Sequence, residues 1–280
     1  MDIIHSVNEL RSRLAGESRI SLVPTMGNLH DGHIHLVNLA RQHGDCVVVS
    51  IFVNPLQFGP NEDLDNYPRT LEQDCARLQA AGADVVFAPS VSEMYPGPQT
   101  MTISAPPIAD SLCGASRPGH FSGVATVVMK LFNLVQPQVA VFGKKDYQQL
   151  SVIRELVKQF NLPIEIIGGE TVRESDGLAM SSRNGYLSTA QRQEAKRLHA
   201  ALQLVKQAVQ KGNHDFSAIC EQTRQYLTQL GWIVDYIEVR AAHTLQPADG
   251  SEQQLVVLGA ARLGKTRLID NLEFDAAGQA

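Results

Sequence analysis

The stretch that decides the fold reads Val23-Pro24-Thr25-Met26-Gly27-Asn28-Leu29-His30-Asp31-Gly32-His33. It follows a short apolar run, residues 20–23, and precedes an amphipathic segment that starts at Ile34. Two histidines therefore flank a glycine at the point where a strand passes into a helix. The unpaired N–H groups and the dipole of a helix N-terminus stabilise anions. A glycine also lets a ligand come close to the backbone.

These histidines point to phosphate chemistry. His30 and His33 can each donate a hydrogen bond to a phosphate whose negative charge grows during reaction. The pattern predicts a nucleoside triphosphate site built for attack at the α-phosphate, the kind of site that forms adenylates. Two other interpretations stay open: simple helix caps, or metal ligands. Structural zinc takes four ligands, usually with closely spaced cysteines, and no two of Cys46, Cys75, Cys113 and Cys220 are close in sequence.

The composition is that of an ordinary globular enzyme. The 280 residues, 44% hydrophobic and 19% charged, can form one large or two modest domains with a sizeable core. The net charge of −5 gives no electrostatic reason to bind nucleic acid or an anionic membrane surface. No apolar run approaches the ~18 residues of a membrane span, and no secretory signal is visible. Scattered cysteines indicate reduced thiols, so we expect a cytoplasmic protein.

The first half of the chain alternates strand-like and helix-like segments. Strands are predicted at residues 20–23, 46–53, 84–88, 139–142 and 164–167, with helices at 34–42, 70–82 and 147–160. Thr70 and Gln73 fit a capping box for the second helix. This alternation predicts right-handed βαβ units and a parallel sheet, whose ligands bind at the carboxyl ends of the strands. We expect an α/β fold with a Rossmann-like domain at residues 1–175.

The pattern changes after residue 175. Ser188 and Gln191 resemble a second capping box that opens a long charged helix to about Lys211, and residues 216–230 predict another helix. Strands are expected at residues 232–239, 254–258 and 267–269. These segments predict a smaller α+β C-terminal domain, residues 176–280, that serves as a lid.

Two turns after predicted strands carry candidate binding groups. Asn54 and Gln57 follow the second strand, and an amide that both donates and accepts suits a ligand with hydroxyl and carboxylate groups. Asn-Pro is also an ordinary loop opener. Lys145 can contact a phosphate, Asp146 can accept from ribose hydroxyls, and Gln149 lies one helical turn beyond Lys145. Asp146 can equally be a helix cap and Lys145 a surface charge.

Two loops are less specific. Ser181, Ser182 and Arg183 combine two hydroxyls and a guanidinium, which can form a mobile anion clamp that closes over the phosphates. The same pattern also fits a plain loop with a helix cap. Residues 117–121, Arg-Pro-Gly-His-Phe, predict another loop, which can serve a substrate, an interface or neither.

In order along the chain, these blocks resemble one family. Residues 24–33, 52–58, 143–149 and 180–187, with shorter matches at 67–70 and 117–121, are similar to the pantothenate synthetases, or pantoate–β-alanine ligases. The resemblance implies a fold similar to class I aminoacyl-tRNA synthetases, a homodimer, and Mg²⁺ with ATP as substrate. The implied reaction joins pantoate to β-alanine through a pantoyl adenylate, releasing pyrophosphate and then AMP.

The resemblance also implies roles for individual residues. His30, His33 and Lys145 would be catalytic, with His33 as proton donor. ATP would be bound by Met26, Gly27, Asn28, Leu29, His30, Asp31, Gly32, His33, Gly143, Lys144, Lys145, Asp146, Val172, Met180, Ser181, Ser182 and Arg183. Pantoate would be bound by Gln57 and Gln149, with Gln57 also near β-alanine. The metal ligands stay unknown. Lys144 departs from the common Gly-Glu-Lys-Asp turn of the family, and we expect its side chain to point away from the nucleotide.

Two other functions compete with the ligase. A nucleotidyltransferase would share the histidine motif but pass a nucleotide to a phosphorylated acceptor, which would favour more basic residues than Gln57 and Gln149. A non-catalytic nucleotide-binding module would need neither the histidines nor Lys145. The negative charge disfavours an RNA-charging role. We therefore expect small-molecule partners, with no nucleic acid and no membrane.

Overall fold

A six-stranded parallel sheet forms the centre of the first half of the chain. The computed structural model describes residues 1–60 and 62–277. The strands are β1 (Asp2–Ile4), β2 (Ile20–Thr25), β3 (Cys46–Ile51), β4 (Val85–Phe87), β5 (Val139–Gly143) and β6 (Glu165–Gly169). They lie in the order β1-β4-β3-β2-β5-β6, and every pairing is parallel. The predicted α/β parallel-sheet fold is confirmed.

The strand order reverses at β2. The chain places β3 and β4 on one side of this strand, and β5 and β6 on the other. The loops that leave the carboxyl ends of β2 and β5 therefore diverge and leave a crevice between them. Open α/β sheets bind their ligands at such a reversal. The histidine stretch and the Gly143–Asp146 turn both lie there.

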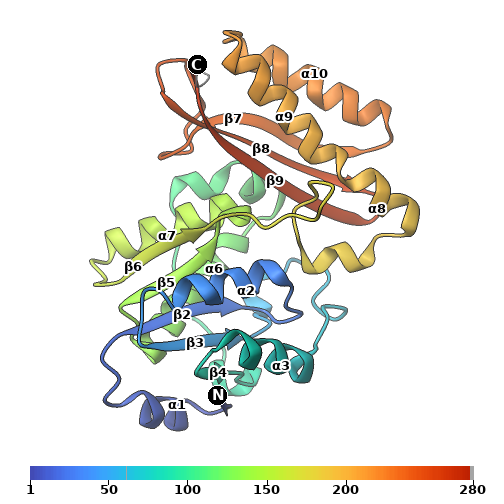
Figure 1. Ribbon diagram of the computed structural model, residues 1–280. Coiled ribbons are helices and arrows are strands. Elements are labelled where there is room, and N and C mark those ends of the chain that lie inside the picture. Colours follow the sequence, from blue (N-terminus) through green and yellow to red (C-terminus); the bar gives the residue numbers. More distant parts are fainter. Residues whose placement is uncertain (61, 278–280) are drawn as a thin grey trace.

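Helices cover both faces of the sheet (Figure 1). One face packs against α1 (Val7–Leu14), α6 (His120–Val135) and α7 (Tyr147–Gln159), and the other against α2 (Asp31–Ala40) and α3 (Leu71–Ala81). Strand β3 shows why the sequence folds this way. Its Val48 side chain packs into the core on the side of α1, α6 and α7, while Val47 and Val49 pack into the core on the side of α2 and α3. A strand buried on both faces needs a continuous apolar run rather than an alternating pattern.

Short helices connect these elements. They are η1 (Pro55–Gln57), α4 (Val91–Met94), η2 (Pro107–Asp110), α5 (Cys113–Ser116) and η3 (Lys144–Asp146). We call residues 1–169 the N-lobe, residues 170–181 the linking segment and residues 182–277 the C-lobe. Figure 1 shows the linking segment passing between the two lobes. The predicted division near residue 175 falls within this segment and stays a prediction.

The C-lobe is a small α+β layer structure. Its strands β7 (Ile233–Ala241), β8 (Gln254–Leu263) and β9 (Thr266–Asp275) form an antiparallel sheet. After η4 (Ser182–Tyr186), helices α8 (Thr189–Ala195), α9 (Arg197–Gln210) and α10 (Phe216–Gln229) share its core. Fully buried Trp232, Leu202 and Leu227 fill the space between the helices and the sheet.

Several local predictions differ from the structure. The capping box at Ser188 is confirmed, but the helix that it opens breaks at Lys196 into α8 and α9. The Thr70 capping box is wrong: Thr70 caps no backbone group, and its hydroxyl donates to Asp74 instead. Residues 120 and 121 begin α6 rather than belonging to a loop. Helix α6 has Gly119 at its N-cap and no side-chain cap, so its start carries none of the usual capping signals.

The cysteines agree with the expectation of reduced thiols. All four are buried and unpaired. Among the described residues, none of the helices has the length and apolar character needed to cross a bilayer.

Candidate active site

A cavity opens beyond the carboxyl ends of β2, β3 and β5, where the strand order reverses. This inner cavity has a volume of about 220 Å³ and is lined by strand-end loops, α6 and the linking segment. It continues into a cleft of about 510 Å³ between the lobes. The inner cavity and the cleft share a wall made by Arg117, His120, Lys145, Asp146, Gln149, Ser181 and Arg183. A ligand in the inner cavity can therefore extend into the cleft.

Most of the predicted site residues line the inner cavity. They are Met26, His30, Gly32, His33, Gln57, Gly143, Lys145, Asp146, Gln149, Val172, Met180, Ser181, Ser182 and Arg183. Five predicted ATP-binding residues do not line it: Gly27, Asn28, Leu29, Asp31 and Lys144. The contacts of single residues with a ligand stay predictions.

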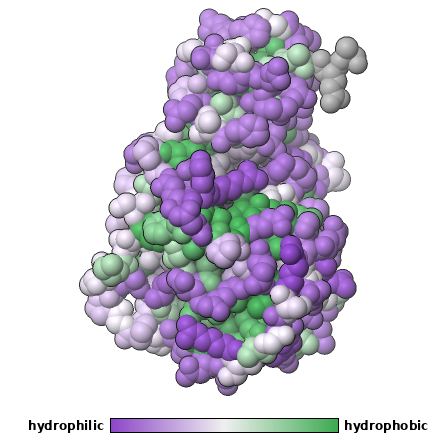
Figure 2. Space-filling model, turned by 90° about the vertical axis from the view of Figure 1, so that its left-hand side faces the viewer, coloured by the Kyte–Doolittle hydropathy of each residue, from purple (hydrophilic) through white to green (hydrophobic). Residues whose placement is uncertain are grey.

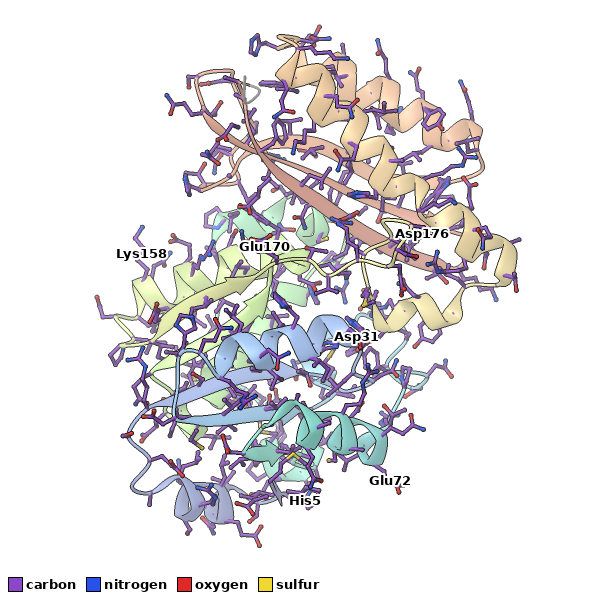
Figure 3. All side chains as sticks on the ribbon, in the orientation of Figure 1. His5, Asp31, Glu72, Lys158, Glu170 and Asp176 are labelled. Atoms are coloured by element: carbon purple, nitrogen blue, oxygen red, sulfur yellow. The ribbon has the colours of Figure 1, made fainter. Side chains whose placement is uncertain are left out.

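The side chains of three of these five residues have other partners. Leu29 is buried in the core between the sheet and α2. Asp31, labelled at the end of α2 in Figure 3, pairs with Arg77. The Lys144 ammonium lies 2.5 Å from a carboxylate oxygen of Glu170 and 2.7 Å from one of Glu273. Lys144 thus joins the N-lobe to β9 of the C-lobe.

The turn before the histidines is held from α3. Gly27 and Asn28 have positive φ angles of 83° and 50°, which turn successive N–H groups toward one point. The buried Asp74 carboxylate occupies that point and accepts from the N–H groups of Asn28, at 2.9 Å, and Leu29, at 2.8 Å. Arg77 donates to the Leu29 carbonyl at 2.9 Å. Helix α3 thereby fixes the turn that leads into α2.

His30 and His33 cap α2 with their rings. The Nδ1 atom of His30 accepts from the Gly32 N–H at 3.1 Å, and Nδ1 of His33 accepts from the His30 N–H at 3.2 Å. Because Nδ1 accepts in both rings, each neutral ring carries its proton on Nε2. A Cβ on residue 32 would lie 2.8 Å from the His30 ring, so any other residue there would push this ring out of its capping position. Capping and phosphate binding, which the sequence presents as alternatives, are therefore compatible in one side chain.

The site keeps both histidines neutral. Burial lowers the pKa of His30 to about 4, and Lys145 adds to the effect. Burial lowers the pKa of His33 to about 3, reinforced by His30, whose ring centroid lies 4.1 Å away. At neutral pH the two rings therefore offer Nε2–H hydrogen bonds rather than positive charges.

Amide groups and apolar side chains form the other end of the cavity. Gln57, on η1, and Gln149, on α7, both face it. The apolar part of the wall comes from α6, through Val124, Val127, Val128 and Leu131. This wall was missed at the level of sequence because α6 was not predicted. We call this region the amide end, and the region around His30, Lys145 and Arg183 the phosphate end.

Arg117 and His120, to which the sequence assigns no definite role, act as a pair. The Arg117 guanidinium makes two 2.6 Å hydrogen bonds to Glu62 and donates to Nε2 of His120 at 2.9 Å. The Nδ1–H of His120 therefore donates to the Gln57 carbonyl at 2.8 Å. Burial, reinforced by Arg117, lowers the pKa of His120 to about 4 and keeps it neutral. The pair fixes the backbone that carries Gln57.

Basic groups gather at the phosphate end. Lys145 and Arg183 line the cavity, and the side chain of Ser182 donates to the Asn28 carbonyl at 3.0 Å. Arg183 is already engaged, because Asp63 accepts from its Nε at 3.1 Å and from its terminal nitrogen at 2.9 Å. Lys145 and Arg183 hold the pKa of the Asp146 carboxyl below its usual value.

The linking segment is fixed to the C-lobe. Arg173 makes two 2.8 Å hydrogen bonds to the buried carboxylate of Asp270, which also lies 3.2 Å from His199 Nδ1. The Met180 N–H donates to the Val172 carbonyl at 3.0 Å. Val172 and Met180 thus reach the cavity wall from a segment whose position is set by the C-lobe. Figure 3 labels Glu170 and Asp176 on the same segment.

Within residues 1–60 and 62–277, no group of three or more His, Cys, Asp or Glu side chains is arranged to hold a metal ion. Mg²⁺ commonly binds through substrate phosphates and water, with only one or two carboxylates from the protein.

Comparison with known proteins gives consistent matches along the chain. The family model described as pantoate-beta-alanine ligase matches residues 2–273. Pantothenate synthetase from Methylobacillus flagellatus is 69% identical over 274 residues, covering 98% of this chain and 99% of the relative. The crystal structure of pantothenate synthetase from Thermus thermophilus has a TM-score of 0.93 at 44% identity, covering 99% of this chain and all of that one.

A second solved structure includes ligands. Pantoate-beta-alanine ligase from Francisella tularensis is described as complexed with beta-gamma ATP and beta-alanine. It has a TM-score of 0.83 at 37% sequence identity and covers 97% of each chain.

Proposed function

This chain belongs to the pantoate–β-alanine ligase family, and on that premise we propose that it joins pantoate to β-alanine at the expense of ATP, with pantoyl adenylate as intermediate. The observation that carries the proposal is the inner cavity itself. A neutral histidine pair and Lys145 line one end, and Gln57 and Gln149 line the other. Family membership favours this reaction over the nucleotidyltransferase and the non-catalytic module.

The first step forms the adenylate. A carboxylate oxygen of pantoate bonds to the α-phosphorus of ATP, and the bond from that phosphorus to the pyrophosphate oxygen breaks. Negative charge grows on the phosphate oxygens during this exchange. The Nε2–H groups of His30 and His33 donate to those oxygens, and the Lys145 ammonium stabilises the charge. Neutral histidines serve as donors without having to lose or gain a proton, so we assign His33 a hydrogen bond rather than a full proton transfer.

The second step uses the same cavity. The amine of β-alanine attacks the carbonyl carbon of the adenylate, loses a proton, and displaces AMP as the C–O bond breaks. Gln57 lies at the amide end, where it can bind pantoate and approach the incoming amine. The valine and leucine side chains of α6 suit the two methyl groups of pantoate, since burying apolar surface is favourable. Such a wall also keeps water from hydrolysing the adenylate.

The remaining ATP contacts follow the lining of the cavity. The triphosphate lies along Gly32, Ser181, Ser182 and Arg183, and reaches Arg183 when that side chain exchanges Asp63 for phosphate. Asp146 and Gly143 bind the ribose, and Met26, Val172 and Met180 lie against the nucleotide. A Mg²⁺ ion held by the triphosphate would neutralise part of its charge. Lys144 takes no direct part, because its ammonium is held by two carboxylates.

We also propose that the enzyme is a cytoplasmic homodimer. Figure 2 shows apolar surface gathered in a band at mid-height on the side where β6 forms the sheet edge. Contiguous apolar surface of this kind marks sites of association, and the unpaired strand edge beside it supports the same proposal. Sedimentation analysis that finds a single monomeric species at micromolar concentration would overturn the dimer.

The adenylation step is tested by exchange of labelled pyrophosphate into ATP, with Mg²⁺ and without β-alanine. We expect exchange that requires pantoate and is lost in His33→Ala. His35→Ala is the matched control, because His35 lies on the same helix but does not line the cavity. Exchange that continues without pantoate would contradict the assigned acceptor. Full exchange in His33→Ala would contradict the role of the histidine.

A further inference from the structure

Asn54 lies at the end of β3 and is almost completely buried, with 1% of its surface exposed. All of its side-chain hydrogen-bonding capacity is used. Its Oδ1 accepts from the Tyr95 hydroxyl at 2.8 Å and from the Leu56 N–H at 3.3 Å. Its Nδ2 donates to the Gly123 carbonyl at 3.2 Å and to Oε1 of Gln57 at 3.1 Å. The amide of Asn54 has two acceptor positions and two donor hydrogens, and each has a partner.

Two backbone groups fix which end of this amide is which. The Leu56 N–H can only donate and the Gly123 carbonyl can only accept, so Oδ1 faces the first and Nδ2 the second. The close approach of Gly123 is possible because it has no side chain: a Cβ there would lie 2.2 Å from the Leu56 carbonyl oxygen. Helix α6 and η1 are thus in contact through their backbones at this point.

The orientation of Asn54 then fixes the orientation of Gln57. Because Nδ2 of Asn54 can only donate, the Gln57 atom that faces it is the oxygen. The Gln57 amino group faces the other way, with Nε2 lying 3.1 Å from the Met26 sulfur and lining the cavity. Sulfur is a weak acceptor, so these N–H groups stay available to a ligand. Gln57 therefore offers a donor to the cavity and not an acceptor.

Tyr95 is the outermost member of this chain of contacts. It follows α4, its ring packs against Phe52 with centroids 5.9 Å apart, and it does not line the inner cavity. Burial raises the pKa of its hydroxyl to about 12, so the group stays a hydrogen-bond donor at any working pH. No ligand contact is needed to explain its hydroxyl, because Asn54 receives its hydrogen bond.

We propose that Tyr95 is a positioning residue that, through Asn54, holds the Gln57 amide with its N–H groups toward an acceptor oxygen of the hydroxy acid. This inference rests on the proposed function, since it takes pantoate as the ligand of Gln57. If the Tyr95 hydroxyl is removed, Oδ1 of Asn54 accepts only from the Leu56 N–H. The Asn54 amide is then held less firmly, and its hydrogen bond to Gln57 becomes less ordered. Pantoate, whose carboxylate can only accept hydrogen bonds, then meets a less ordered donor.

The test is a double-mutant cycle of Tyr95→Phe and Gln57→Ala, read by pantoate-dependent pyrophosphate exchange. Loss of one neutral hydrogen bond predicts a rise in KM for pantoate of roughly 3- to 10-fold in Tyr95→Phe. KM for ATP stays unchanged. In the Gln57→Ala background the same substitution has no further effect on the pantoate KM, because the group that Tyr95 orients is gone. Tyr226→Phe, on the exposed side of the C-lobe, is the matched control.

The outcomes separate the two levels of the proposal. Exchange that is absent in the unmodified enzyme would overturn the proposed function and this inference with it. Normal exchange together with an unchanged pantoate KM in Tyr95→Phe would overturn the inference alone. So would an equal rise in the KM values for pantoate and ATP, or an effect of Tyr95→Phe that persists in full in the Gln57→Ala background, because each indicates a general structural role.

Discussion

The two ends of the inner cavity differ in how ready they are for their ligands. At the amide end the protein's own hydrogen bonds orient Gln57 and leave its N–H groups facing the cavity. At the phosphate end the guanidinium of Arg183 is held by the carboxylate of Asp63. One end presents N–H groups whose partner is a weak sulfur acceptor, whereas the other presents an arginine already paired with a carboxylate.

This difference has a physical reason. An amide can be buried in a fixed orientation when each of its groups has a partner, and a weak partner such as the Met26 sulfur is easily replaced. Lys145 and Arg183 both line the phosphate end, and their like charges repel each other, so the Asp63 carboxylate that pairs with Arg183 stabilises this arrangement. We therefore expect hydroxy acid to bind with little rearrangement, and triphosphate to displace a carboxylate from Arg183.

The largest effect is expected at Lys145. Lys145→Ala removes a charge from the phosphate end, and electrostatic stabilisation of this kind contributes about 10²- to 10³-fold to rate. Pyrophosphate exchange should fall by that factor, while KM for pantoate stays near its normal value. Lys144→Ala is the neighbouring control and should retain activity within a few-fold. Equal losses in the two variants would contradict the distinction between them.

At the amide end, Asn54→Asp should invert the donor pattern. The new carboxylate turns an acceptor toward Gln57, so the Gln57 amide rotates, gives its N–H groups to that carboxylate, and faces the cavity with its oxygen. The Gln57 oxygen would then repel the pantoate carboxylate, and the hydrogen bond from the Gln57 N–H to pantoate would be lost. Together these effects predict a rise in pantoate KM of roughly 10- to 100-fold. Steady-state kinetics with each substrate varied will measure it. Asn38→Asp, on the exposed side of α2, is the control, and a change confined to the ATP KM would be the contrary result.

At the phosphate end, Asp63→Asn should improve ATP binding. The variant frees Arg183 from its carboxylate, and exchange of a partly exposed ion pair is worth about 0.5–1 kcal/mol. KM for ATP should therefore fall about 2- to 5-fold, with the pantoate KM unchanged. Asp65→Asn changes an exposed carboxylate of the same loop and should have no effect. A higher KM for ATP in Asp63→Asn would show that the carboxylate assists the nucleotide instead of competing with it.

The smallest effect concerns stability against pH. The pKa values of His30, His33 and His120 are lowered to between about 3 and 4 in the folded protein. Below their ordinary value near 6.5 the unfolded chain binds protons that the folded protein does not, so stability falls as pH decreases from about 6.5 toward 4. Thermal unfolding between pH 7 and 5 will measure the slope. Replacing His120 by Asn should make it shallower, and an unchanged slope would contradict the assigned protonation state.

Much of the fold could be predicted because its signals are local. The buried run of β3 and the glycine and histidines after β2 each depend on neighbours in sequence. Helix α6 lacks such a local signal at its start, because no side chain caps its first turn. Its absence from the prediction hid the apolar wall of the cavity and the role of Gly123.

The sequence predicts which residues form the site, but it does not predict which side chains they pair with. The histidines, Lys145 and the amides stand in short motifs whose chemistry is legible. The partners that set their behaviour lie far away in sequence: Asp63 is 120 residues from Arg183, and Tyr95 is 41 residues from Asn54. Only the folded chain brings these groups together, and so only the structure reveals which cations are engaged and which way an amide faces.

Isotope transfer tests the adenylate most directly. Pantoate labelled with ¹⁸O in its carboxylate is converted with ATP and β-alanine, and the products are analysed by mass spectrometry. If the carboxylate attacks the α-phosphate, one labelled oxygen per turnover leaves with AMP. Label in inorganic phosphate, with ADP as the nucleotide product, would show attack at the γ-phosphate and would contradict the assignment of the histidine pair to the α-phosphate.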